Sequence, residues 1–325
     1  MYFDIRKFPG YGKLSGNTIK KLQAGKRISV REEKKGPLDF ALWIENPNHL
    51  MQWESPWGRG YPGWHIECSA MSMAHLGETI DIHTGGEDNI FPHHECEIAQ
   101  SEGATGKAFV NYWLHPRHLL VDGKKMSKSL GNFYTLRDLL GKGHGQREIR
   151  FLLLSANYRT RLNFTEKSLR QARSTVQSLD NFVSGLGSVG RGKQNKKVPG
   201  LVKKAREGFE EAMDDDLNIS LALSHLFDLV GNINRLLERK AISKEDAKVV
   251  LDFVVDLDRV LGLELGKDVW ASAGKAPAEI RKLIKERERL REGGDWEEAD
   301  KIRDRLREMG IILEDTKEGP RWKRE

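Results

Sequence analysis

The stretch DIHTGGEDNIFPHHECE, residues 81–97, decides the fold class of this 325-residue chain. Thr79–His83 alternates like a short strand, two glycines follow, and Phe91–Glu102 reads as a helix with a proline in its first turn. Upstream, Trp64–Leu76 is apolar on one helical face, and downstream Ala108–Val121 contains strand-like runs. Helices and strands that alternate at this spacing predict part of a parallel α/β sheet.

The rest of the chain follows a different pattern on each side of this region. Residues 1–56 are polar and turn-rich, with small strands between loops. After Thr135 the pattern is almost wholly helical, interrupted by a Gly/Ser/Lys-rich linker at 184–200. The expected helices are Arg147–Ala156, Thr165–Leu186, Leu201–Met213, Ser220–Arg239, Ser243–Leu263, Ala278–Glu292 and Trp296–Met309. The sequence therefore predicts an α/β part followed by an all-α bundle and a small, charged C-terminal part.

The amino-acid composition argues against a membrane-spanning protein and against a disulfide-rich secreted one. The chain is 38% hydrophobic and 31% charged and has no run of eighteen apolar residues, so we expect no membrane span. It has only two cysteines and begins without the apolar core of a signal peptide, which favours a cytoplasmic protein without a disulfide scaffold. Residues 141–206 hold fifteen Lys or Arg against three Asp or Glu, whereas residues 276–325 hold fourteen of each sign. The first of these regions is either a nucleic-acid-binding surface or an ordinary solvated helical face.

One interpretation of Cys68, His93 and Glu97 is that they form a metal site. His93 and Glu97 are four residues apart on one helical face, and Cys68 lies on a separate expected helix. A thiolate, an imidazole and a carboxylate are ligands of Zn²⁺, but three do not complete a tetrahedral site. Cys96 could replace Glu97 or simply pack in the core. A surface contact between His93 and Glu97 and a buried Cys68 are the alternatives.

The segment VDGKKMSKSLGN, residues 121–132, places three lysines between glycines and small polar residues. Such a loop cannot build a core, and its ammonium groups suit a polyanion such as a nucleoside triphosphate. Two further residues could line a site. Trp64 precedes Cys68 by four residues, and Asp88 follows two glycines at a strand end, where a carboxylate can approach a ribose.

Taken together, these residues resemble the cysteinyl-tRNA synthetases, a family of class I aminoacyl-tRNA synthetases. The loop signature Lys-Met-Ser-Lys-Ser is complete at residues 125–129. The stretches 56–71, 81–97, 215–230 and 295–322 also match the family's pattern, so that the resemblance spans nearly the whole chain. It implies the second half of a Rossmann-type nucleotide-binding fold, a helical bundle and a C-terminal anticodon-binding region.

The resemblance implies a role for individual residues. Cys68, His93 and Glu97 match zinc ligands that hold the substrate cysteine, and Trp64 matches an aromatic residue beside it. Lys125 and Lys128 match the catalytic loop lysines that bind ATP, used with Mg²⁺, and Asp88 matches an acid that contacts its ribose. Cysteine activated as its adenylate would then be transferred to tRNA-Cys. At the C-terminus, Trp296, Arg303, Asp315 and Trp322 match recurring family residues, and we expect Trp296, Arg303 and Trp322 to contact tRNA.

The resemblance also divides the chain. Residues 1–56 match part of a connective insertion, 57–141 the second half of the catalytic domain, 142–186 a helical stem-contact region, 187–265 a tRNA-binding bundle, and 276–325 the anticodon-recognition region. The family's His-Ile-Gly-His signature and its fourth zinc ligand, a cysteine, do not occur in this sequence. We therefore expect an N-terminally truncated chain that is inactive alone and binds zinc weakly. Its other half is encoded separately, lost by deletion, or left out by a wrongly assigned start codon.

Two other functions remain open from the sequence. A cysteine–aminosugar ligase would use the same zinc and adenylate chemistry, but such enzymes lack a C-terminal tRNA-reading region. A non-catalytic tRNA-binding remnant would keep the basic region and the C-terminal helices, with affinity that falls steeply as salt rises.

Overall fold

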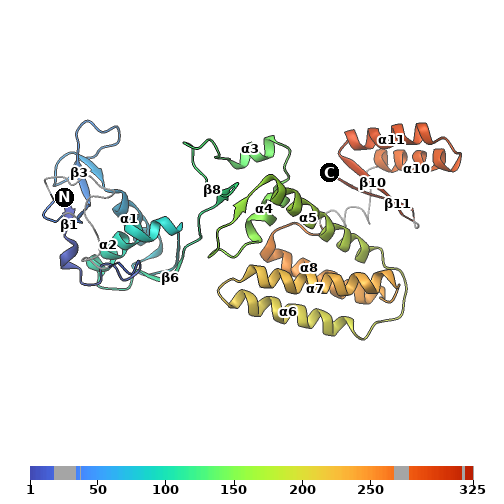
Figure 1. The fold of residues 1–325 in the computed structure, drawn as a ribbon, viewed down its shortest axis with the longest axis horizontal. Helices are drawn as coiled ribbons and strands as arrows, with labels where there is room; N and C mark the ends of the chain where they lie inside the picture. Colours follow the sequence, from blue (N-terminus) through green and yellow to red (C-terminus); the bar gives the residue numbers. More distant parts are fainter. Residues whose placement is uncertain (18–33, 37, 267–277, 317–318, 325) are drawn as a thin grey trace. The chain divides into compact units, whose positions relative to one another are not determined.

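The computed structural model describes residues 1–17, 34–36, 38–266, 278–316 and 319–324 (Figure 1). The chain forms two compact units. Unit 1 consists of Met1–Leu119 and Tyr158–Arg161, and unit 2 of Leu120–Asn157 and Leu162–Glu325. No helix in these described ranges is both long enough and apolar enough to cross a membrane.

Unit 1 contains the predicted α/β element. Strands β5 (Ile80–Thr84) and β6 (Val110–Leu114) pair in parallel. The chain between them forms a short 3-10 turn, a π-helical turn η3 (Ile90–His94) and helix α2 (Glu95–Thr105). Helix α1 (Trp64–Leu76) packs against α2. The parallel α/β prediction is confirmed for this strand pair, because parallel strands need such a helical crossover.

Two small antiparallel pairs precede the parallel pair. They are β1 (Tyr2–Phe3) with β2 (Phe40–Ala41), and β3 (Trp43–Glu45) with β4 (Gly60–Pro62). A glycine at 60 is required here, because a Cβ would lie 2.0 Å from the carbonyl oxygen of Ile44. Cys96 packs in the core beneath β2 with Tyr11, whose hydroxyl lies 3.5 Å from the Cys96 sulfur. Of the two interpretations of Cys96, the structure favours core packing.

Unit 2 begins with a three-stranded sheet of order β8-β7-β9. Its strands are β7 (Leu120–Val121), β8 (Lys124–Lys125) and β9 (Asn163–Phe164). β9 departs from the expectation that the chain is almost wholly helical after Thr135. Two residues are too few for a periodic pattern, and the strand exists because β7 offers a free parallel edge.

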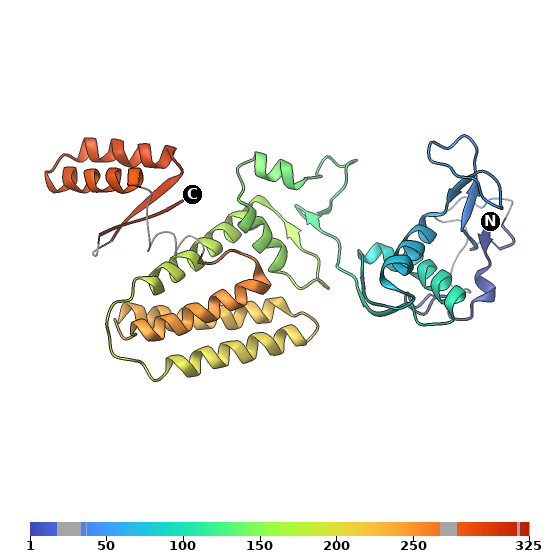
Figure 2. The same ribbon diagram turned by 180° about the vertical axis from the view of Figure 1, so that it is seen from behind.

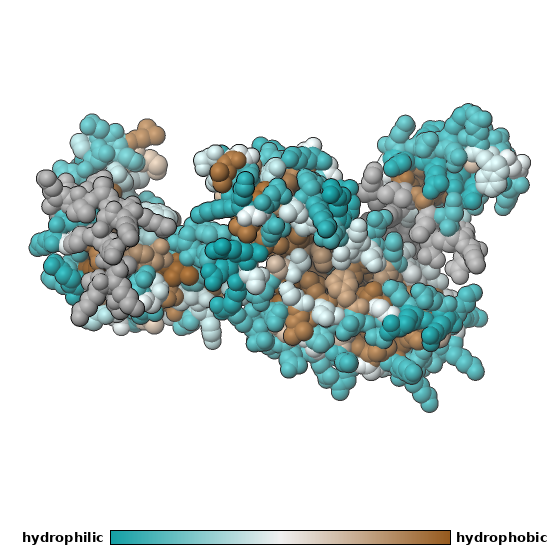
Figure 3. Space-filling view, viewed as in Figure 1, coloured by the Kyte–Doolittle hydropathy of each residue, from teal (hydrophilic) through white to brown (hydrophobic). Residues whose placement is uncertain are grey.

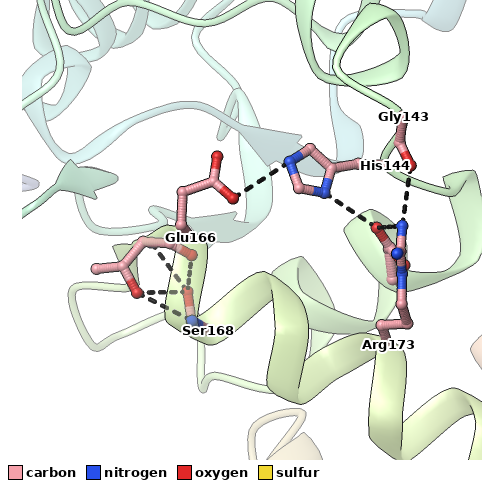
Figure 4. Close-up of polar contacts among 7 residues, drawn as sticks. Gly143, His144, Glu166, Ser168 and Arg173 are labelled. Atoms are coloured by element: carbon pink, nitrogen blue, oxygen red, sulfur yellow. Dashed lines mark hydrogen bonds and ion pairs between the residues drawn. The ribbon is translucent and has the colours of Figure 1, made fainter.

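Helices α3 (Leu136–Gly141), α4 (Gln146–Leu154) and α5 (Glu166–Gly187) follow. Thr165 caps α5, with its hydroxyl accepting from the backbone N–H of Ser168. The turn before α4 is tied to α5 through a charged network shown in Figure 4, in which His144 faces Glu166 and Arg173 donates to the Gly143 carbonyl. Arg173 also donates to the buried carboxylate of Glu148.

The bundle is formed by α6 (Val198–Asp214), α7 (Ile219–Glu238) and α8 (Lys244–Leu261), which pack with α5. Both views show α6 and α7 side by side (Figures 1 and 2). Their buried faces carry the apolar residues at helical spacing that the sequence predicts. The residues expected to form a linker include Asn195, which is fixed to the bundle because its backbone N–H donates to Asp246 and its side chain to the Ala241 carbonyl.

The C-terminal part consists of α10 (Ala278–Glu292), α11 (Trp296–Glu308) and a hairpin of β10 (Ile311–Thr316) with β11 (Gly319–Arg324). Its core consists of Ile280, Leu283, Leu306, Ile311 and Leu313. Figure 3 shows the hydrophilic side chains that cover α10 and α11. Both helices were expected, but the hairpin was not, because charged residues interrupt its strand pattern.

Candidate metal and nucleotide site

The structure brings Cys68, His93 and Glu97 together in unit 1. Cys68 lies on α1, His93 in η3 and Glu97 in the first turn of α2. One ligand atom from each lies within 4.8 Å of the other two. The convergence expected from the sequence is therefore present, and it depends on the packing of α1 against α2.

Glu97 is the centre of this cluster. Its side chain is 0% exposed, and its two carboxylate oxygens lie 2.6 Å from Nε2 of His93 and 2.9 Å from Nε2 of His83. Neither oxygen accepts a hydrogen bond of ordinary geometry from a described group. Burial raises the pKa of this carboxyl, but the contacts with His83 and His93 outweigh burial and lower the pKa to about 2. Glu97 is thus a buried anion that faces imidazole nitrogens at contact distance.

Sequence reasoning missed most of the surrounding histidines. His83, His94 and Glu97 form a second group whose ligand atoms lie within 4.8 Å of one another. Nδ1 of His65 lies 2.8 Å from Nδ1 of His93, and Nδ1 of His94 lies 2.8 Å from Nε2 of His115. The sequence offered one signal, since His65 lies at the start of an expected helix and His83 at the end of an expected strand.

Burial lowers the pKa of His65 and of His94. Desolvation, together with the neighbouring His93, lowers the pKa of His65 to about 4. Desolvation also lowers the pKa of His94 to about 4, although the nearby Glu97 acts in the opposite direction. The pKa of the Cys68 thiol is raised by burial and by the charge of Glu97. Neutral imidazoles are the form that coordinates a metal.

The cluster fits a zinc ion by its chemistry. Sulfur, imidazole nitrogen and carboxylate oxygen are the usual protein ligands of Zn²⁺. A buried carboxylate without a hydrogen bond of ordinary geometry is rare, and a bound cation is one of its ordinary explanations. The contacts of His65 with His93 and of His83 with Glu97 have the form of outer contacts that orient metal ligands.

Trp64 and Asp88 lie near this cluster in the chain, in different surroundings. The Trp64 ring is 61% exposed and lies 4.2 Å, centroid to centroid, from the ring of His93, so it covers an imidazole of the cluster. Asp88 is exposed just beyond the carboxyl end of β5. Gly85, at the same strand end, leaves room for the ring of His94, because a Cβ there would lie 2.5 Å from Cε1 of that ring.

The loop that carries Lys125 and Lys128, within residues 121–132, belongs to unit 2. Lys125 ends β8, and Lys128 lies in the loop that follows, with its ammonium 5.6 Å from the centroid of the Phe133 ring. Both lysines are exposed. The loop therefore presents two cations on a short, hydrogen-bonded segment.

Unit 2 also carries two surfaces suited to RNA. Lys167 and Arg170 are exposed on one face of α5, where they line a shallow depression with Gln171, Ser174 and Thr175. In the C-terminal part, Trp296 is 60% exposed and lies under the guanidinium of Arg291. Arg303 is exposed on α11, whereas Trp322 packs partly buried against the C-terminal core.

Family comparisons cover most of the chain. Residues 1–174 match the class I (C) tRNA synthetase catalytic domain. Residues 208–266 match the DALR domain, and residues 273–322 match the cysteinyl-tRNA ligase anticodon binding domain.

Individual relatives agree with these matches. The chain is 46% identical to a cysteine–tRNA ligase of Chlamydia muridarum (strain MoPn / Nigg), over all of this chain and 70% of that protein. It is also 46% identical to a cysteine–tRNA ligase of Chlamydia pneumoniae, over 99% of this chain and 69% of that protein.

Proposed function

The chain belongs to the cysteinyl-tRNA synthetases, class I ligases that form aminoacyl-tRNA, and we propose which of its residues carry that activity. Cys68, His93 and Glu97 bind zinc and select cysteine. Lys125 and Lys128 bind the phosphates of ATP, used with Mg²⁺, and Asp88 contacts its ribose. The tRNA partner that the family implies is tRNA-Cys.

The observation that carries the metal assignment is the buried carboxylate of Glu97 beside His93 and Cys68. A bound zinc ion would hold the sulfur of the substrate as a thiolate and so favour cysteine over serine. The residues of this chain supply the rest of the selection. Trp64 covers the His93 ring and restricts access to it.

The two lysines act by charge and position. Attack of the substrate carboxylate on the α-phosphate of ATP builds negative charge on the phosphate oxygens, and ammonium groups stabilise that charge. Lys128 is exposed and touches only an aromatic ring among the contacts described for its ammonium. It is therefore free to exchange that ring for a phosphate.

For tRNA binding, the exposed face of α5 contacts the phosphate backbone of the RNA. The C-terminal part contacts its bases. Lys167 and Arg170 suit phosphate oxygens. The exposed ring of Trp296 suits base stacking, and Arg303 is free to approach the same strand. Trp322 supports this surface from the core. The C-terminal match supports this assignment over a cysteine–aminosugar ligase.

Titration of the chain with zinc, and then with cysteine or serine, tests the proposal without requiring turnover. We expect one zinc ion per chain, and cysteine binding that depends on zinc and exceeds serine binding. Equal binding of cysteine and serine, or zinc binding unchanged after replacement of both Cys68 and His93 by alanine, would contradict it.

A further inference from the structure

The loop that carries Lys125 and Lys128 is closed by one side chain, that of Asn132. Its amide oxygen accepts from the backbone N–H of Ser127 at 2.9 Å, and its amide nitrogen donates to the carbonyl oxygen of Lys125 at 3.1 Å. Asn132 thus uses both halves of its amide on the segment that contains the two lysines. These bonds join the end of the loop to its beginning.

The interior of the loop is fixed by its own small residues. The backbone N–H of Leu130 donates to the hydroxyl of Ser127 at 3.3 Å, and that of Gly131 to the carbonyl of Lys128 at 3.1 Å. Gly131 has φ of 66°, a left-handed conformation that favours glycine and turns the chain so that Asn132 faces back toward β8. The serines of this segment are therefore engaged in holding its shape.

The base of the loop has a second asparagine contact. The side-chain oxygen of Asn163 on β9 accepts from the backbone N–H of Gly123 at 2.8 Å and so fixes the β7–β8 turn. With the base fixed, the position of Lys128 relative to Lys125 depends on the path of residues 126–131. Asn132 is the residue whose side chain spans that path.

We propose that Asn132 is a positioning residue for nucleotide binding: its side chain holds Lys125 and Lys128 at the spacing that a triphosphate requires. This inference deepens the proposed function and rests on the nucleotide role of the two lysines. Asn132 itself does not touch the reacting atoms. Removing its amide would release the loop while leaving both ammonium groups in the chain.

Limited proteolysis of the full chain with trypsin, without nucleotide, tests the closure directly. Cleavage after Lys125 and Lys128 requires the loop to open, and its rate follows the open population when opening is fast. We expect Asn132→Ala to raise cleavage at these two sites by about 5- to 30-fold, the effect of losing one or two net hydrogen bonds. Asn132→Asp, which keeps the acceptor for Ser127 but loses the donor, should give a smaller rise.

The matched control is Asn232→Ala on α7, since Asn232 also donates its amide to a carbonyl, that of Asp228, but far along the chain from the loop. It should leave cleavage at Lys125 and Lys128 unchanged. Thermal melting of each variant separates a local opening from a general loss of folding. If Asn132→Ala is cleaved at the wild-type rate, the closure is refuted.

Adding Mg·ATP tests positioning separately from closure. ATP should slow cleavage at Lys125 and Lys128 in the wild-type chain, and Asn132→Ala should need an about 5- to 30-fold higher ATP concentration for half-maximal protection. The positioning role would be overturned if Asn132→Ala is cleaved faster than the wild-type chain without nucleotide but reaches half-maximal protection at the same ATP concentration. If ATP protects neither protein, the proposed nucleotide role of the lysines fails and the positioning role with it, whereas the nucleotide-free rates still decide the closure.

Discussion

Nε2 of His93 lies 2.6 Å from Oε1 of Glu97, one helical turn further along the chain, and the Glu97 side chain is completely buried. The other oxygen of the same carboxylate lies 2.9 Å from Nε2 of His83. Among the described residues, no lysine or arginine forms an ion pair with Glu97. A buried carboxylate surrounded by imidazoles and a thiol is costly to fold unless a cation compensates it.

Glu97→Gln should therefore remove most of the metal affinity. The substitution keeps the shape of the side chain but replaces an anionic ligand by a neutral amide. We expect a loss greater than the about 10- to 100-fold that the loss of an outer contact causes. Zinc competition with a chromophoric chelator measures it. Glu102→Gln on the same helix, where Glu102 pairs with Lys13 at 2.6 Å, is the control.

His83→Gln should weaken zinc binding without abolishing it. His83 contacts the carboxylate of Glu97 and, in the proposed site, orients it rather than binding the metal. An affinity loss of about 10- to 100-fold is expected for such an outer contact. His75→Gln, at an exposed position in the last turn of α1, should have no effect. A complete loss of zinc from His83→Gln would make His83 a ligand instead.

On α5, replacing Lys167 and Arg170 by alanine should weaken tRNA binding for all sequences alike. Each lost phosphate contact should reduce the slope of log affinity against log salt by about 1. Filter binding at several salt concentrations measures this slope. The control is Lys203→Ala on α6, whose ammonium already lies 3.6 Å from Glu207. An unchanged slope in the double variant would exclude this face of α5 as a phosphate contact.

The sequence predicted the elements with strong periodicity and the residues of one cluster. Trp64–Leu76 and Ala278–Glu292 form helices with the expected bounds, since apolar spacing and caps act locally. The pair His93 and Glu97 was visible for the same reason, because an i,i+4 spacing on a helix fixes proximity.

The sequence could not show what depends on tertiary contact. His83 and His115 approach the cluster from strand ends, and no local spacing links them to Glu97. The hairpin of β10 and β11 was not predicted, because its strands carry charged residues that interrupt an alternating apolar pattern. One of them, Asp315, is paired with the buried Arg287. The two side-chain hydrogen bonds of Asn132 could not be predicted either, since the sequence of a loop has no periodic pattern.

Truncating a buried leucine of the helical bundle should destabilise it far more than truncating an exposed one. Leu226 and Leu221 both lie on α7, but Leu226 is 1% exposed and Leu221 is 45% exposed. Leu226→Ala should destabilise the bundle by about 2–5 kcal/mol, through lost burial and a cavity, whereas Leu221→Ala should stay within about 0.5 kcal/mol. Hydrogen exchange of α7 amides in the full chain measures both. Equal effects would mean that α7 does not pack as described.

Acid should loosen the C-terminal part through Asp315. The guanidinium of Arg287 donates to both oxygens of Asp315 at 2.8 Å and lowers the pKa of that carboxyl below its ordinary 3.8. A lowered folded pKa means that the pair stabilises the fold above about pH 3.8 and that this contribution is lost as pH falls through the folded value. Asp315→Asn should remove this acid dependence and cost about 1 kcal/mol at neutral pH, because Asp315 is exposed and Arg287 keeps its contact with Glu288. Hydrogen exchange of α10 and β10 amides between pH 3 and 7 measures both effects, with Asp304→Asn on the exposed face of α11 as the control. An unchanged acid response in Asp315→Asn would assign the loss of stability to other carboxylates.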